Sequence, residues 1–244
     1  MKIVISGSKF EDVNYEEIIN FIKKFKFDVE IEEDFLLKFP EKIDFLAEEM
    51  AKIRVLNPDK RELNDNPFEI EIEYEKENLK RNIRKKGIIY SGNHFLKIIK
   101  NLLKDRLNLN NEWIIYFSDQ ILATFEGRWH VRVIIFGIPV IISIPGIVYG
   151  PAREREYYLS KEIGVPLKVD YIKEIDERKT DVLKGYILQA IYFYKSIFQG
   201  EEFKFCEDEN CSIYNSHWQR EVLNAQLKQN LCKKHLKEFF EWKN

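Results

Sequence analysis

Cysteine and histidine are scarce in this chain of 244 residues, which contains three of the former and four of the latter. We expect a cytoplasmic protein. Three cysteines cannot all pair within one chain, and in a reducing compartment a cluster of them suggests a metal site sooner than disulfides. No apolar run approaches the roughly 18 residues needed to span a bilayer, because Gly137, Pro139 and Pro145 interrupt the longest one. The opening MKIVISGSKFED lacks the apolar core and cleavage site of a signal peptide.

The chain also has little excess charge. Its 39 Lys and Arg residues stand against 41 Asp and Glu residues, which gives a net charge of -2. No global field therefore recruits nucleic acid or a membrane surface. The one dense basic run, KRNIRKKG at residues 80–87, is typical of a solvated helix end. A phosphate-contacting patch is the alternative.

Hydrophobic periodicity in the first third of the chain predicts alternating strands and helices. Residues 2–6 and 27–33 are expected strands on either side of a helix over 15–25. A second helix is expected over 43–52. The alternating EIEIEYE of residues 69–75 predicts a strand with one wet face.

The segment after Gly87 has a different character. A helix is expected over residues 94–106, before the buried strand WIIYF at 113–117. Residues 128–150 hold two β-rich runs broken at Phe136-Gly137, which predicts a hairpin. A loop and helix over 150–164 and a long helix over 181–198 follow.

These elements predict an α/β (α+β) fold in three stretches. The first is an α/β region over residues 1–86, the second a β-rich region over 87–180, and the third a set of C-terminal helices over 181–244. No linker rich in Gly, Ser and Pro separates them, so one compact domain is the alternative.

All three cysteines lie in one short stretch with the spacing of a metal site. Four residues separate Cys206 from Cys211, twenty separate Cys211 from Cys232, and two separate Cys232 from His235. Tetrahedral zinc is usually held by two such close pairs, and thiolates with one imidazole suit Zn²⁺. Four protein ligands leave no position for water, so we expect a structural site. His217, which lies between the pairs, is the alternative fourth ligand.

The motif C-x4-C-x-I-x18-C-x2-H resembles the structural zinc element that closes archaemetzincins, metallopeptidases with a long ligand-bearing helix just before the first cysteine. That family has Met where this chain has Ile213, and Cys where it has His235. The VIIFGIPVIIS run at 133–143 is similar to the family's FG-containing strand region. Most of the chain also resembles a set of archaeal proteins classed as metallopeptidases, including the segments GRWHVR, GPAREREYY and NSHWQREVL. The resemblance implies a zincin/archaemetzincin-like mixed sheet with flanking helices and a C-terminal helical zinc-binding element.

The resemblance fails at the catalytic motif HExxHxxGxxH. Residues 188–206, where that motif belongs, contain no histidine. With Gly200 as the glycine of the motif, Phe193 and Ile197 take ligand positions and Tyr194 takes the position of the general base. Phe and Ile cannot bind zinc. We therefore expect a metallopeptidase-like protein without the standard catalytic centre, which binds a peptide or protein partner or regulates one, and whose status as an enzyme stays open.

Other polar side chains are candidates for catalysis or binding: His130, Arg132, Glu154, Glu156 and His217. His130 and Arg132 share one face of their expected strand, which suits a carboxylate or phosphate ligand. His217 and Glu221 lie four apart and share a helical face if a helix begins by His217. Surface ion pairs and packing are the alternative roles for all of them.

Two further functions compete with a binding module. One is an unconventional metallohydrolase or peptidase that uses the polar residues around His130 and Glu154. The weaker one is a nucleic-acid-binding zinc protein, against which the acidic residues 207–209 in the zinc loop argue.

Overall fold

The computed structural model describes residues 1–81, 87–107, 109, 112–165 and 170–241. These residues divide into two compact units, each built from separate stretches of the chain. The sheet unit comprises residues 2–9 and 30–146, and the zinc unit comprises residue 1, residues 10–29 and residues 147–244. The expected division at residues 86 and 180 stays a prediction.

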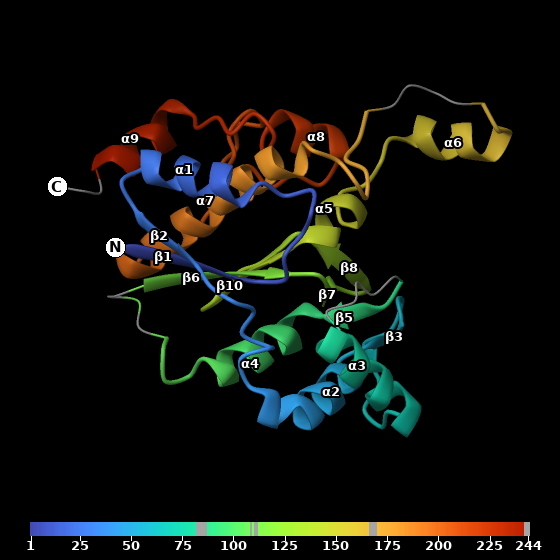
Figure 1. Cartoon of the computed structure of the whole chain (residues 1–244). Helices are drawn as coiled ribbons and strands as arrows, with labels where there is room; N and C mark the ends of the chain where they lie inside the picture. Colours follow the sequence, from blue (N-terminus) through green and yellow to red (C-terminus); the bar gives the residue numbers. More distant parts are fainter. Residues whose placement is uncertain (82–86, 108, 110–111, 166–169, 242–244) are drawn as a thin grey trace. The chain divides into compact units, whose positions relative to one another are not determined.

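The largest sheet has five strands in the order β2-β1-β6-β10-β9 (Figure 1). Its strands are β1 (Lys2–Gly7), β2 (Asp28–Ile31), β6 (Glu112–Ser118), β9 (Ile134–Ile135) and β10 (Val140–Ser143). β6 runs parallel to β1 and β10, whereas β9 runs antiparallel to β10. The central strands are almost entirely buried, as is typical of parallel strands. The expected mixed sheet is confirmed.

Two smaller sheets complete the strands. β5 (Ile89–Ser91), β7 (Ile121–Phe125) and β8 (Trp129–Arg132) form one, with β7 in the middle. β3 (Val55–Asn57) pairs with β4 (Glu62–Leu63) in the other.

The hairpin expected within residues 128–150 is formed by β9 and β10. Ile141 lies opposite Ile135, and Ile142 lies opposite Ile134. The break at Phe136-Gly137 is therefore the turn, and the Ile138-Pro139 peptide bond in it is cis.

Three helices of the sheet unit lie together on one face of β1, β6 and β10 (Figure 1). They are α2 (Ile43–Lys52), α3 (Glu69–Arg81) and α4 (Gly92–Leu102), and a 3-10 turn (Pro40–Lys42) precedes α2. Their apolar side chains share one core with the strands, in which the ring of Phe95 lies 5.9 Å from that of Tyr116. The helix expected over 43–52 is thereby confirmed, and the one expected over 94–106 exists but ends at Leu102.

The strand expected at residues 69–75 is wrong, because these residues begin α3. Alternation of Glu with Ile suits a strand, but Glu is also a good helix former. The helical period places Glu71 and Glu75 one turn apart, and both contact Arg54. Ile70 consequently points outward and is 78% exposed, whereas Ile72 packs against the core.

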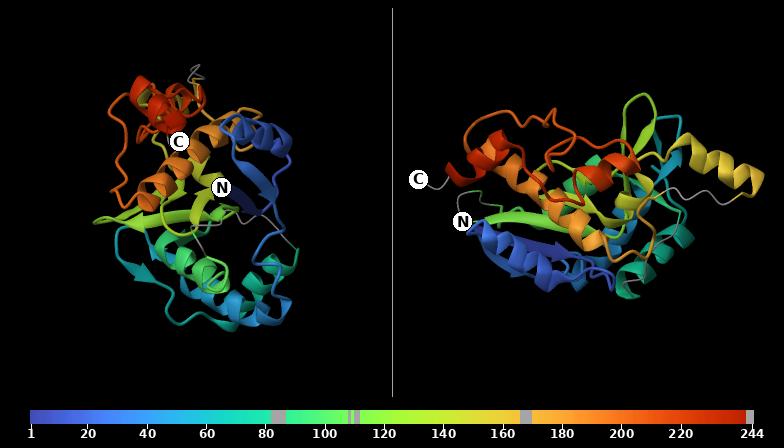
Figure 2. Two further views of the ribbon diagram at one scale, coloured as in Figure 1. Left: turned by 90° about the vertical axis from the view of Figure 1, so that its left-hand side faces the viewer. Right: turned by 90° about the horizontal axis from the view of Figure 1, so that it is seen from above.

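The zinc unit is mainly helical. Its helices are α1 (Tyr15–Lys24), the second half of α5 (Ile144–Tyr149), α6 (Arg155–Ile163), α7 (Lys179–Phe198), α8 (Gln219–Asn224) and α9 (Lys233–Glu241). α1 packs against α7, and the side chain of Asn14 caps α1 by accepting a hydrogen bond from the Glu17 N–H at 3.1 Å. α6 projects from the other helices of this unit (Figure 2). None of its residues is buried.

Most of the basic run at residues 80–87 lies outside the described residues, which omit 82–86. Lys80, at the end of α3, forms an exposed ion pair with Glu77 at 3.2 Å. No helix in the described part of the chain is both long and apolar enough to cross a membrane.

Candidate metal centre

Cys206 and Cys211 lie on a tight turn that precedes α8. The Cys206 N–H donates to the Ile213 carbonyl at 3.1 Å, and the Tyr214 N–H donates to the Cys211 carbonyl at 2.8 Å. These bonds fold the chain back on itself and bring the two sulfurs to one side. The Asp208 N–H also lies 3.4 Å from Cys206 Sγ, where it stabilises negative charge on that sulfur.

Cys232 and His235 belong to the start of α9. Cys232 directly precedes the helix, and His235 lies in its first turn, so the two side chains are neighbours. The N-terminus of a helix favours negative charge, which suits a thiolate at Cys232. The Cys232 N–H lies 3.5 Å from Cys211 Sγ and links this pair to the first one.

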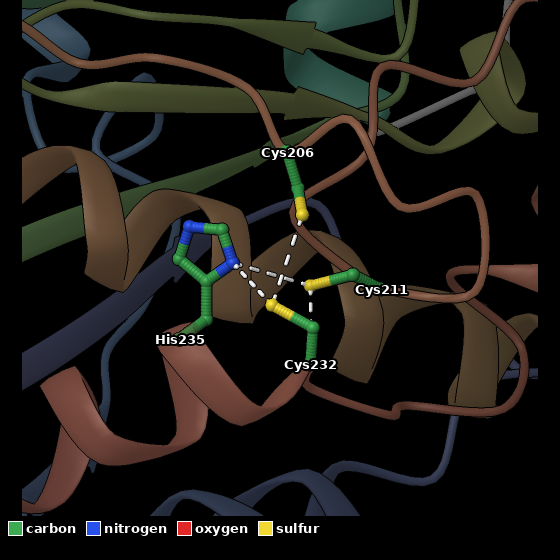
Figure 3. Close-up of side chains that lie close together, drawn as sticks. All are labelled: Cys206, Cys211, Cys232 and His235. Carbon is green, nitrogen blue, oxygen red and sulfur yellow. Dashed lines mark hydrogen bonds between the residues drawn. The ribbon is translucent and has the colours of Figure 1, made fainter.

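The four donor atoms lie within 4.8 Å of one another (Figure 3). Cys206 Sγ is 3.8 Å from Cys232 Sγ, and His235 Nδ1 is 3.5 Å from Cys211 Sγ and 3.1 Å from Cys232 Sγ. With Zn–S of about 2.3 Å and Zn–N of about 2.0 Å, a tetrahedral zinc site has S···S edges of about 3.8 Å and S···N edges of about 3.5 Å. The donor set therefore fits zinc both in chemistry and in spacing, and we assign zinc as the metal.

Burial makes this cluster unfavourable without a cation. Cys211 is fully buried, and burial raises the pKa of its thiol to about 12. Burial also raises the pKa of Cys206 and lowers that of His235, which is 2% exposed. Bound Zn²⁺ supplies the positive charge that lets the sulfurs act as thiolates and the imidazole as a neutral ligand.

Two buried glutamines hold the turn between Cys211 and α8 in place. The Gln189 amide, on α7, donates to the carbonyls of Ser212 and Tyr214 at 2.8 and 2.9 Å. The Gln226 amide donates to the same two carbonyls at 3.3 and 3.0 Å. The sequence analysis missed both residues, since no spacing rule marks them.

Aromatic side chains surround the metal cluster on the α7 side. The ring of Tyr192 meets His235 edge to face at 4.7 Å, and its hydroxyl donates to Glu238 at 2.6 Å. Phe193 packs on Phe203 at 5.7 Å. Phe193, which takes a ligand position in the expected metzincin motif, thus contributes to aromatic packing.

His217 does not join the four donors, since its side chain is exposed and outside the cluster. The expected helical face shared by His217 and Glu221 is also wrong, because α8 begins at Gln219. The Glu221 carboxylate instead accepts hydrogen bonds from the backbone N–H groups of His217 and Trp218, at 2.7 and 3.1 Å. It therefore caps α8.

The other candidate residues fall in both units. His130 and Arg132 lie on β8 in the sheet unit, where Arg132 donates to Thr124 at 2.8 Å and pairs with Glu126. Glu154 and Glu156 belong to the zinc unit and line one cavity there.

The fold and the cluster define a mixed α/β protein with a Cys3His zinc site. Residues 4–238 match the model of a family of unknown function (DUF7001), and the chain belongs to that family. No curated protein matches the sequence.

Two solved structures are similar to the chain over nearly its whole length. Archaemetzincin from Methanopyrus kandleri is 10% identical, with 99% of this chain and 94% of that one covered and a TM-score of 0.49. A zinc-dependent peptidase from Methanocorpusculum labreanum is 12% identical, with 97% and 99% covered and a TM-score of 0.44. An archaemetzincin, the family that the cysteine spacing resembles, is thus among the structures to which the chain is similar.

Proposed function

We propose that this protein is a zinc-stabilised, metallopeptidase-like binding module, which recognises a peptide or protein and does not cleave it. The observation that carries the proposal is the closed donor set of Cys206, Cys211, Cys232 and His235. A catalytic zinc keeps a coordination position for water or substrate, whereas four protein donors fill a tetrahedron. Zinc in this site stabilises the fold and supplies no chemistry to a substrate.

The side chains of α7 support the absence of peptidase chemistry. A zinc peptidase needs imidazole or carboxylate ligands and a general base on its active-site helix. At the positions where the metzincin motif has these groups, this chain has Phe193, Tyr194 and Ile197. Tyr194 is 1% exposed, so a substrate cannot reach it without a rearrangement of the helix packing.

A cavity of about 430 Å³ in the zinc unit supports a binding role. Its volume is in the lower part of the range of small-ligand pockets, and it fits the end of a peptide better than a folded surface. Its charged lining residues are Arg153 and Glu154 before α6, Glu156 in the first turn of α6, Asp170, and Arg220 at the start of α8.

Two assays on the zinc-loaded protein test this proposal. The first measures hydrolysis of a mixture of unstructured peptides by mass spectrometry, with and without a chelator. The second measures binding of a random peptide library to the immobilised protein, with the zinc-free protein as the control. We expect no chelator-sensitive cleavage, and selective enrichment of peptides on the zinc-loaded form. Chelator-sensitive cleavage that disappears in His130→Ala or His217→Ala would refute the proposal.

A hydrolase that uses carboxylates is the second candidate, because Glu154 and Glu156 line the same cavity. Two carboxyl groups can act as general acid and base when their environments differ. A substrate screen on wild-type protein and on Glu154→Gln tests this candidate. Turnover that is lost in the variant would favour the hydrolase over the binding module.

A further inference from the structure

The cavity in the zinc unit is built by two segments that lie far apart in the sequence. The Ala152 N–H donates to the His217 carbonyl at 2.7 Å, and the Gln219 N–H donates to the Ala152 carbonyl at 2.8 Å. This short parallel bridge holds Arg153 and Glu154 beside Gln219 and Arg220. Gln219 is 2% exposed, and its side-chain amide binds the backbone of Ile147 and Ile172. These hydrogen bonds therefore hold Gln219, one of the residues that line the cavity, in a fixed position.

Arg153 occupies a corner formed by two tyrosine rings. Its guanidinium carbon lies 4.5 Å from the ring centre of Tyr157 and 4.6 Å from that of Tyr171. The two rings meet edge to face at 5.1 Å, and Arg153 beside them is half-buried. Arg153 also donates to the Tyr157 hydroxyl at 2.7 Å. These contacts orient a planar donor that suits a carboxylate.

Two charged side chains that line the cavity, the cation Arg153 and the anion Glu156, form no ion pair among the described residues. Among the described residues, no carboxylate forms an ion pair with Arg153, and its buried Nε has no hydrogen-bond partner. Of the carboxylates that line the cavity, Glu154 lies 3.3 Å from Arg220 Nε, and Asp170 pairs with Arg178 at 2.9 Å. Glu156 has no such cation within the described part of the chain. A zwitterionic ligand can pair with both Arg153 and Glu156. A phosphate dianion, in contrast, is repelled by the three carboxylates that line the cavity.

We propose that this cavity binds the free C-terminus of a peptide whose last residue is Lys or Arg. Arg153 receives the terminal carboxylate through charge-assisted hydrogen bonds, and Glu156 receives the cationic side chain. The inference rests on the proposed binding function and names its ligand. A free basic amino acid carries the same two charges, so the test separates it from a peptide end.

Fluorescence anisotropy with labelled six-residue peptides tests the inference. One peptide ends in lysine with a free carboxylate, a second has the same sequence as a C-terminal amide, and a third ends in alanine with a free carboxylate. We expect the amide to bind at least about tenfold more weakly than the acid, because it loses the charge-assisted bonds to Arg153. Arg153→Met should cause a similar loss. Arg155→Met, an exposed neighbour outside the cavity lining, is the matched control and should bind like wild type.

The pairing of Glu156 with the cationic side chain of the peptide is tested with Glu156→Gln. The exposed Glu162→Gln on the same helix is the control. Glu156→Gln should weaken the lysine-ended peptide and leave the alanine-ended peptide unchanged. Each variant is first shown to keep its zinc and its thermal unfolding midpoint.

Three results would overturn the inference. They are equal binding of acid and amide, equal binding by Arg153→Met and Arg155→Met, and competition by free lysine as strong as that by the peptide. Peptides that still bind without regard to their ends would refute this inference and leave the proposed function standing. Failure of the random library and of all three peptides would refute both.

Discussion

Arg54→Met should destabilise the sheet unit strongly, because it removes the cation that neutralises a fully buried carboxylate. Arg54 Nε donates to Glu75 Oε1 at 2.8 Å, and a second guanidinium nitrogen lies 2.6 Å from the same oxygen. The Glu75 side chain is 0% exposed and that of Arg54 is 11% exposed. The Tyr90 hydroxyl donates to the same oxygen at 2.8 Å. Methionine matches the length of the arginine stem and removes the positive charge of Arg54 from the Glu75 carboxylate.

Loss of one partner of a buried ion pair costs about 3–5 kcal/mol. Because the Tyr90 hydroxyl remains as a donor, we expect a value near the lower end, about 3 kcal/mol. Lys80→Met, on α3 with Glu75, is the matched control. Its ion pair with Glu77 is exposed on both sides, and such pairs contribute only about 0.3–0.5 kcal/mol.

Urea unfolding followed by tryptophan fluorescence measures the difference, since Trp113 is completely buried in the same unit. The double variant Arg54→Met with Glu75→Gln should recover part of the loss, because the buried charge is gone. A destabilisation by Arg54→Met within about 0.5 kcal/mol of that by Lys80→Met would refute the reasoning. Zinc content should stay unchanged in all of these variants.

Two further predictions concern packing and pH. Gly185→Ala on α7 should destabilise the protein by about 1–3 kcal/mol, even though Ala is the better helix former. The reason is that a Cβ at Gly185 would lie 2.4 Å from the Gln226 carbonyl oxygen. A higher thermal unfolding midpoint in the variant would contradict this. Hydrogen bonds from Arg106 lower the pKa of Glu32 to about 2, so this pair stabilises the fold above pH of about 4.5 and the effect is lost as pH falls toward 2. Glu32→Gln should remove about 1–2 kcal/mol of that acid dependence, after a discount for partial exposure, and identical pH profiles of wild type and variant would show the reasoning to be wrong.

Elements with a strong local pattern could be predicted from the sequence. β1 and β6 are nearly continuous apolar runs, and α1 has apolar residues on one face and a capping Asn14. The metal cluster was predictable for a similar reason, because each pair of donors is close in sequence. The helix α3 was missed, since its glutamates alternate with apolar residues while their partner Arg54 comes from a distant segment.

The cavity depends on contacts that no local pattern encodes. The bridge between Ala152 and Trp218 joins residues that are distant in the chain. From the sequence, Glu154 and Glu156 were candidates for one site together with His130 and Arg132, which belong to the other unit. Arg153, which the tyrosine rings orient, was not among the candidates, because the alternation of Arg and Glu over residues 153–156 is typical of surface ion pairs.

The zinc content of the native protein tests the central claim most directly. Elemental mass spectrometry on wild type, Cys232→Ala and His217→Ala gives the stoichiometry, and thermal unfolding of the same samples gives the stability. A closed structural site predicts one zinc per chain in wild type and in His217→Ala. It predicts no bound zinc and a lower unfolding midpoint in Cys232→Ala. Zinc that persists in Cys232→Ala, or zinc that is lost in His217→Ala, would contradict the assignment of Cys206, Cys211, Cys232 and His235 as the four ligands.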